Sequence, residues 1–159
     1  MLAIILKGAL IGAGATILMD IWAFLYAVAV KENSPNWAPI GRWFRHLGKG
    51  KVFHTDIGLA EPYDHELVLG WIGHYAVGII YGIAFVLMMG EGWLDMPRFL
   101  PAWIFGLVTV AFGWFLLQPG LGIGWAASKT PNPNKVRLLN LIGHTVFGFG
   151  LYGTALLIA

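Results

Sequence analysis

The chain has 159 residues, of which 58% are hydrophobic and 11% charged, whereas charged residues make up roughly 25% of an ordinary soluble domain. A domain of ~150 residues still leaves about a third of its unfolded surface exposed, so this composition excludes a soluble monomer. The mean hydropathy of +0.72 is typical of a chain that lies in lipid. The absence of cysteine excludes disulfides, thiolate metal sites and dithiol redox chemistry.

Four stretches of the sequence are long and apolar enough to span a bilayer, which takes about 20 residues. They cover residues 2–30, 67–89, 99–117 and 136–159. The first stretch has no basic amino-terminal cluster and is longer than the apolar part of a signal peptide, so we expect it to stay in the membrane. The sequence therefore predicts an all-α membrane protein, a single four-helix transmembrane domain over residues 1–159.

The basic residues gather in two of the three loops that join these spans. Eight of the ten lysines and arginines lie in or beside the loops over residues 31–66 and 118–135: Lys31, Arg42, Arg45, Lys49, Lys51, Lys129, Lys135 and Arg137. Basic loops face the cytoplasm in membrane proteins. With an even number of crossings, both termini are expected on the periplasmic side of a bacterial inner membrane.

The long loop contains a short amphipathic stretch over residues 39–47. Its apolar residues recur with helical spacing at Ile40, Trp43, Phe44 and Leu47, and basic residues occupy the other side. We expect a short interfacial helix, with Arg42, Trp43, Phe44 and Arg45 as its anchors at the lipid head groups. A loop turn that packs on the ends of the spans is the alternative.

The second and fourth spans share a short internal repeat. Ile72-Gly73-His74 with Gly78 and Tyr81-Gly82 matches Ile142-Gly143-His144 with Gly148 and Tyr152-Gly153, with one insertion. Both copies begin near the expected cytoplasmic end of their span. The match indicates a tandem repeat of two helical hairpins, which is a known way of building membrane bundles.

Small and polar residues recur every four positions along three of the spans, as in Gly8, Gly12, Thr16 and Asp20 of the first. Gly70, His74, Gly78 and Gly82 repeat this spacing in the second span, and Asn140, His144, Gly148 and Tyr152 repeat it in the fourth. In lipid, small residues permit close backbone approach, and polar residues hydrogen-bond between helices. These faces are expected to join helices within the bundle, and to allow a homo-oligomer or a larger membrane complex.

Asp20, His74 and His144 are the polar residues of these faces that most need an explanation. Counted from the cytoplasmic ends of their spans at 1.5 Å per residue, their depths agree to within about one helical turn, ~5 Å. A carboxylate near the middle of a membrane costs roughly 2.5–3.5 kcal/mol on insertion scales. We therefore expect Asp20 to face the bundle, where the two histidines could meet it.

Several uses of this set stay open at the level of sequence. One carboxylate and two imidazoles can ligate a divalent metal, and His74 with His144 could instead be the axial ligands of a haem. The same groups, with Thr16 and Asn140 on the same faces, could bind a small ligand or relay a proton, and transport is one use of such a site. In the plainest alternative, Asp20 hydrogen-bonds a histidine and only fixes the register of two helices.

No motif of ordinary enzyme chemistry accompanies these residues. The sequence has no phosphate-binding glycine loop, nucleophile elbow or HExxH helix, so we expect no enzyme of these classes and no nucleic-acid partner. The polar residues before the second span are expected to be mostly solvated or capping groups: His46, His54, Asp56, Glu61, Asp64, His65 and Glu66.

Taken together, several motifs resemble a known bacterial family. They are Met19-Asp20 with Trp22, Gly41-Arg42-Trp43, Gly70-Trp71 with His74-Tyr75 and Gly78, Gln118-Pro119 with Gly122 and Gly124, Ser128 with Thr130-Pro131 and Pro133, and His144 with Val146-Phe147-Gly148 and Gly150-Leu151-Tyr152. The pattern resembles the integral membrane proteins that contain domain of unknown function 2938, over essentially the whole chain. The resemblance implies a bacterial inner-membrane protein and brings no established activity.

Overall fold

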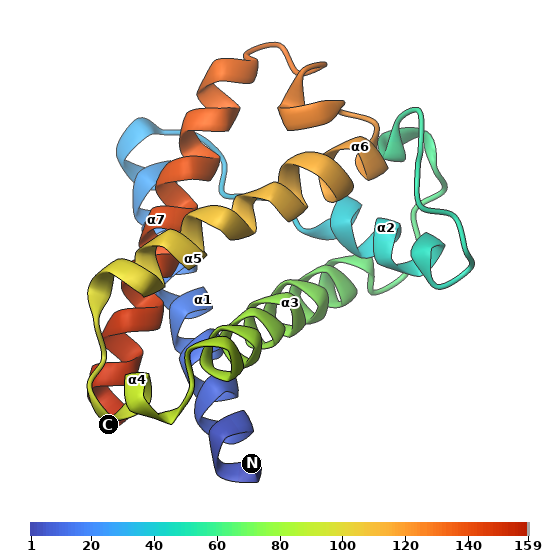
Figure 1. Ribbon diagram of the computed structural model, residues 1–159. Coiled ribbons are helices and arrows are strands. Elements are labelled where there is room, and N and C mark those ends of the chain that lie inside the picture. Colours follow the sequence, from blue (N-terminus) through green and yellow to red (C-terminus); the bar gives the residue numbers. More distant parts are fainter. Residues whose placement is uncertain (159) are drawn as a thin grey trace. The chain divides into compact units, whose positions relative to one another are not determined.

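The computed structural model describes residues 1–158, and these residues form helices and connecting turns without a strand (Figure 1). Four helices are long and apolar enough to cross a membrane: Leu2–Val30, Glu66–Met89, Phe99–Leu121 and Pro133–Ile158. The all-α class and the four spans expected from the sequence are confirmed. The four helices are compatible with a multi-pass membrane protein.

The spans are joined by short helical segments. In chain order the elements are α1 (Leu2–Val30), α2 (Ala38–Leu47), the 3-10 turn η1 (Ile57–Leu59), α3 (Glu66–Met89), α4 (Glu91–Asp95), α5 (Phe99–Phe112), the π-helical turn η2 (Gly113–Leu117), α6 (Gln118–Leu121), the 3-10 turn η3 (Trp125–Ala127) and α7 (Pro133–Ile158). The expected helix in the long loop is present as α2.

The third span runs four residues further than its expected end at residue 117. A proline inside a regular α-helix clashes with the carbonyl four residues earlier, so Pro119 argues against a regular α-helix that continues past this point. The turn before Pro119 is instead a wider π turn, in which the Gln118 N–H bonds to the Gly113 carbonyl. The helix then ends at Leu121, because Gly122 adopts the left-handed conformation with φ 90°.

The fourth span begins at Pro133, three residues earlier than expected. The side chain of Asn132 accepts a hydrogen bond from the backbone N–H of Lys135 at 3.2 Å, which is the contact of a helix N-cap. Proline is well tolerated at the first helical position, where its missing N–H would have no partner anyway. Asn132-Pro133 therefore starts the helix rather than preventing it.

The described chain divides into two compact units, each with its own core. The first unit comprises Met1–Ser34, Tyr75–Thr109 and the C-terminal segment from Leu141. Its core is formed by Ile11, Ala15, Phe85, Val86, Trp93, Leu94, Ala102, Phe147, Leu151 and Ala155. The second unit comprises Pro35–His74 and Val110–Asn140, and its core is formed by Trp43, Ile57 and Leu121. Neither unit corresponds to one helical hairpin.

Much of the apolar surface of the spans is exposed. On α1, for example, Leu10, Phe24, Leu25 and Val28 are each more than half exposed. Such a surface would be an aggregation site in water, whereas it is the expected surface of a helix in lipid. On the same helix, Ile11 and Ala15 face the core and are fully buried.

Candidate functional site

In the first unit, glycines bring α1 and α3 into direct contact. A Cβ atom added to Gly12 would lie 2.9 Å from the Cα of Ile79, and one added to Gly8 would lie 2.8 Å from the Cα of Ile83. Two helices can approach this closely only where both lack side chains at the crossing. Gly82 shares the crossing with Gly8 and Gly12, so this glycine face joins helices of the same chain.

Thr16 completes the crossing. Its side chain is 1% exposed, and its hydroxyl donates to the Gly12 carbonyl at 2.8 Å. Threonine in a membrane helix commonly bonds to the carbonyl four residues earlier. Because the hydroxyl also lies against Gly78, Thr16 contributes to helix packing here.

Asp20 lies one turn further along α1, and its carboxylate has a partner on α3. The hydroxyl of Tyr75 donates a hydrogen bond to Oδ2 of Asp20 at 2.9 Å. Both side chains are partly buried. A carboxylate in a membrane span is thus held by a neutral phenol of a neighbouring helix. Tyr75 was not among the expected site residues, although it directly follows His74 in the repeat.

His144 on α7 is held by α5, and the hydrogen-bond pattern fixes its tautomer. The hydroxyl of Thr109 donates to the Gly106 carbonyl at 2.6 Å, so its oxygen accepts from Nδ1 of His144 at 2.9 Å. The same Nδ1 lies 3.2 Å from the Gly106 carbonyl, which can only accept. Nδ1 therefore carries the proton, and Nε2 holds the lone pair of the neutral side chain.

His74 belongs to the second unit, where aromatic side chains pack on it. Its ring stacks on Trp37 with centroids 3.9 Å apart, and Trp71 approaches it edge-on at 5.9 Å. Trp37 is supplied by the segment that leads into α2. This aromatic setting was not expected from the sequence, because Trp37 is separated from His74 by more than thirty residues.

The described residues 1–158 contain no group of three or more His, Asp or Glu side chains that could hold a metal ion. Asp20 and His144 belong to the first unit and His74 to the second. Each has contacts of its own: Asp20 with Tyr75, His144 with Thr109 and His74 with Trp37. The metal, haem, ligand-binding and proton-relay uses of these residues stay predictions.

Asn140 is the centre of a polar cluster in the second unit. Its Oδ1 accepts from the indole N–H of Trp114 at 3.0 Å and from Nε2 of Gln118 at 2.8 Å. An indole can only donate, so the orientation of both amides is fixed. Gln118 is 7% exposed, and its Oε1 is buried without a hydrogen-bond partner among the described residues. The cluster joins α7 to the π turn.

The expected lipid anchors of α2 differ in how far they are buried within the protein. Trp43 is fully buried and Arg42 is 7% exposed, so neither reaches the lipid head groups, and that part of the expectation is wrong. The indole of Trp43 donates to the Val52 carbonyl at 2.7 Å, and Phe44 lies against Gly73 of α3. Trp43 and Phe44 therefore pack on the protein, as in the alternative interpretation, but they do so from a helix rather than from a loop turn. Arg45 is exposed.

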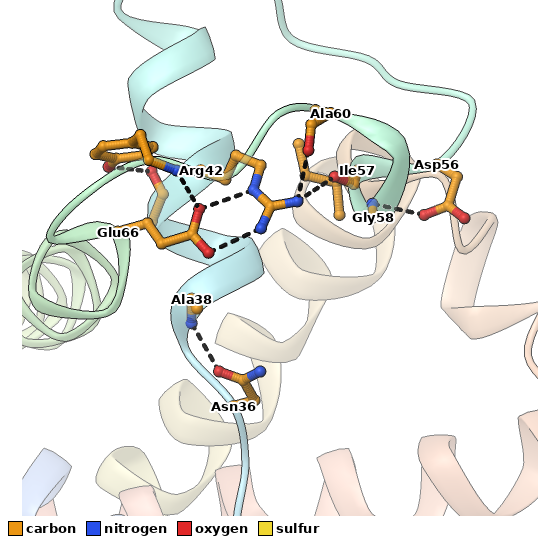
Figure 2. A network of polar contacts seen from close by, with 10 residues as sticks. Asn36, Ala38, Arg42, Asp56, Ile57, Gly58, Ala60 and Glu66 are labelled. Carbon is orange, nitrogen blue, oxygen red and sulfur yellow. Dashed lines mark hydrogen bonds and ion pairs between the residues drawn. The ribbon is translucent and has the colours of Figure 1, made fainter.

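Arg42 clamps the long loop to the beginning of α3. Figure 2 shows its guanidinium between the carboxylate of Glu66 and the backbone of η1. Two hydrogen bonds of 2.8 Å reach Glu66, and Nη1 donates to the carbonyls of Ile57 and Ala60 at 3.1 and 2.8 Å. The bond to Glu66 raises the pKa of Arg42 above its usual value, although burial opposes this.

Two other polar features of the loop are a capping carboxylate and a pair of histidine rings. The carboxylate of Asp56 accepts from the Gly58 N–H at 2.7 Å and so caps η1 (Figure 2), as expected of a residue in this position. Nδ1 of His46 lies 2.7 Å from Nε2 of His54, whose Nδ1 lies 2.9 Å from the Gly120 carbonyl. This histidine pair was not expected from the sequence.

The comparison with protein families gives one match. A family model described as a protein of unknown function, domain of unknown function 2938, matches residues 9–158. The chain belongs to this family. The match includes most of the first span and all of the other three, and it confirms the resemblance seen in the sequence motifs. No curated protein and no solved structure matches the chain.

Proposed function

We propose that this family member is a proton-binding protein of the bacterial inner membrane, in which Asp20 takes up and releases a proton during the passage of a small solute. The hydrogen bond of 2.9 Å between the Tyr75 hydroxyl and the Asp20 carboxylate carries this proposal. Ionisable residues inside membrane spans are rare and mark proton relays and ion pathways. A phenol is a suitable partner because it donates to the charged carboxylate and can accept from the protonated one.

His144 is the second group that could take part. Its neutral ring carries a proton on Nδ1 and a lone pair on Nε2, which is the state that can accept a further proton. Thr109 and the Gly106 carbonyl hold the ring in this tautomer. Protonation of His144 would leave both contacts intact, because Nδ1 remains a donor. His74 belongs to the second unit and is a separate candidate for proton binding.

The orientation in the membrane is part of the proposal. The basic loops support a cytoplasmic position for α2 and for the segment before α7, with both termini in the periplasm. The natural chain has no cysteine, so single cysteines report topology without background. A cysteine at Lys49 should react with an impermeant maleimide only in inside-out vesicles, and one at Asp95 only in intact spheroplasts. The reverse pattern would contradict this orientation.

Proton flux in proteoliposomes tests the function. With a pH-sensitive dye inside the vesicles and an imposed pH gradient, the natural protein should carry protons faster than empty vesicles. Asp20→Asn should abolish this flux, and Tyr75→Phe should reduce it, since only the hydroxyl is lost. Asp95→Asn, an exposed carboxylate in α4, is the control. Equal flux for Asp20→Asn and the natural protein, both folded in detergent, would rule out the proposal.

Two other experimental outcomes would favour a different function. An absorption band of haem in the purified protein would favour a redox subunit with His74 and His144 as ligands. Stable co-purification with another membrane protein, and no flux, would favour an accessory subunit. The glycines of the α1–α3 crossing are already occupied inside the chain, so such a partner or a second copy would use open positions such as Gly153.

A further inference from the structure

A polar cleft lies beside α2 in the second unit, and none of its lining residues belongs to the proposed proton site. It has a volume of about 410 Å³ and is lined by Arg45, His46, Lys49, Glu61, Tyr63 and Asp64, together with Pro62. Binding sites for small molecules span roughly 300–1,000 Å³. The cleft is therefore large enough for a small polar ligand.

The charges around the cleft are balanced. Arg45 and Lys49 are cationic, and Glu61 and Asp64 are anionic, and none of these four forms an ion pair within residues 1–158. Arg45 lies over the ring of Tyr63 at 4.3 Å, which holds it at the wall. A simple anion would be repelled by the carboxylates and a simple cation by Arg45 and Lys49. A ligand that carries both charges meets neither penalty.

His46 adds a hydrogen-bond acceptor to this set. The Gly120 carbonyl can only accept, so Nδ1 of His54 carries the proton at 2.9 Å. In a pair of neutral rings, Nε2 of His54 then accepts, and its partner at 2.7 Å, Nδ1 of His46, donates. This series of hydrogen bonds leaves Nε2 of His46 with a lone pair, and no protein hydrogen bond to it is found within the described residues. Burial, followed by the charges of its neighbours, lowers the pKa of His46, which favours this neutral form.

The cleft is next to a membrane span. Tyr63 and Asp64 precede Glu66, the first residue of α3, by three and two positions, and Glu66 is fixed to Arg42 of α2. A ligand in the cleft is therefore close to where α3 enters the lipid.

We propose that this cleft binds a zwitterionic phosphoethanolamine group, with the phosphate at Arg45 and Lys49 and the primary ammonium at Glu61, Asp64 and Nε2 of His46. The ammonium has N–H groups to donate to an imidazole, whereas the quaternary ammonium of phosphocholine has none. The group can come from a membrane lipid or from a soluble ester. This assignment does not depend on the role of Asp20.

The choice between lipids tests the site. Delipidated protein in detergent is mixed with equal amounts of phosphatidylethanolamine and phosphatidylcholine that have identical acyl chains, and native mass spectrometry measures which lipid stays bound. The natural protein should retain phosphatidylethanolamine about tenfold more, which corresponds to ~1.4 kcal/mol. In a second arm, glycerophosphoethanolamine should bind and glycerophosphocholine should not. Binding in this arm without lipid retention supports a soluble ligand at the same site.

Three variants separate the parts of the site. The His46→Asn side chain keeps an N–H near the position of Nδ1 but has no counterpart of Nε2. This variant should therefore retain phosphatidylethanolamine only as well as it retains phosphatidylcholine. Lys49→Gln should weaken both lipids, since both carry the phosphate. Arg98→Gln removes an exposed charge before α5 and should change nothing. Equal retention of the two lipids by the natural protein, or an unchanged preference in His46→Asn, would overturn the proposal.

Discussion

The guanidinium of Arg42 and the carboxylate of Glu66 face each other across two hydrogen bonds of 2.8 Å, with both side chains largely buried. The pair ties the helix of the long loop to the first residue of α3, and Arg42 also holds two backbone carbonyls of the loop. One side chain therefore fixes both the loop and the entry to a span. This arrangement explains why an arginine is buried in the long loop.

Removal of Arg42 should release the loop. Arg42→Met removes the cationic partner of the Glu66 carboxylate and the guanidinium donor of two carbonyls, and breaking a buried pair in this way costs about 3–5 kcal/mol. We expect a lower thermal midpoint in detergent and rapid proteolysis between α2 and α3. Arg45→Met, which removes an exposed arginine of the same helix, should have little effect. Equal stability of the two variants would contradict the role of Arg42.

The glycines of the α1–α3 crossing should not tolerate a methyl group. In Gly12→Ala the new Cβ would meet the backbone of Gly78 and Ile79, and overpacking of this kind costs about 1–3 kcal/mol. Gly153→Ala meets nothing within 4 Å and should stabilise α7 by roughly 0.5–1 kcal/mol, because alanine has the better helix propensity. Unfolding in detergent measures both. A Gly12→Ala protein as stable as Gly153→Ala would show that the helices do not cross here.

The amides at the π turn should respond unequally to substitution. Asn140→Leu leaves the buried N–H groups of Trp114 and Gln118 without an acceptor, at about 1–3 kcal/mol each. Gln118→Met removes one hydrogen bond, but it also removes the buried Oε1 that has no partner within the described residues. Because these two changes oppose each other, the change in unfolding free energy should be close to zero. The unfolding free energies of the two variants check this order. A larger loss of stability in Gln118→Met than in Asn140→Leu would contradict this assignment of hydrogen bonds.

Acidification should loosen the histidine contact of the long loop. The pKa of His46 is lowered in the folded protein, chiefly by burial and then by the charges of His54, Lys51, Lys49 and Arg45. The unfolded loop therefore takes up a proton more readily than the folded loop. The contribution of neutral His46 to the stability of the folded loop is fully present above the ordinary histidine pKa of about 6.5. This contribution is lost as the pH falls through the lower pKa that His46 has in the folded protein. Glu61, Tyr63 and Asp64 also line the cleft at His46.

Hydrogen exchange of the His54 amide measures this loss, because that amide bonds to the Gly120 carbonyl at 3.1 Å. Its protection should decrease in acid in the natural protein. The decrease should be smaller in His46→Asn, which keeps a donor toward His54 and cannot titrate. Protection that is independent of pH, or the same in both proteins, would contradict the tautomer assignment.

The sequence predicts the spans better than it predicts the contacts between them. Length and hydropathy place four helices correctly to within a few residues, because crossing a bilayer imposes a minimum apolar length. The four-residue spacing of Gly8, Gly12 and Thr16 correctly indicates a face for close packing. The helical spacing of the apolar residues correctly places a helix near residues 39–47.

The partners of the polar residues depend on long-range packing and were largely missed. Tyr75 joins Asp20 from fifty-five positions away, and Thr109 joins His144 from thirty-five. The amphipathic pattern of α2 fits a lipid surface and a protein surface equally well, and only the burial of Trp43 distinguishes them. The π turn has no sequence signal beyond Pro119, which argues for an earlier stop.

The protonation of Asp20 is the central claim, and infrared spectroscopy measures it most directly. A difference spectrum between acid and neutral samples of the protein in lipid should contain the C=O band of a protonated carboxyl group that Asp20→Asn lacks. In Tyr75→Phe the band should shift, because its hydrogen-bond partner is lost. A spectrum with the same carboxyl bands in the natural protein and in Asp20→Asn would contradict the account.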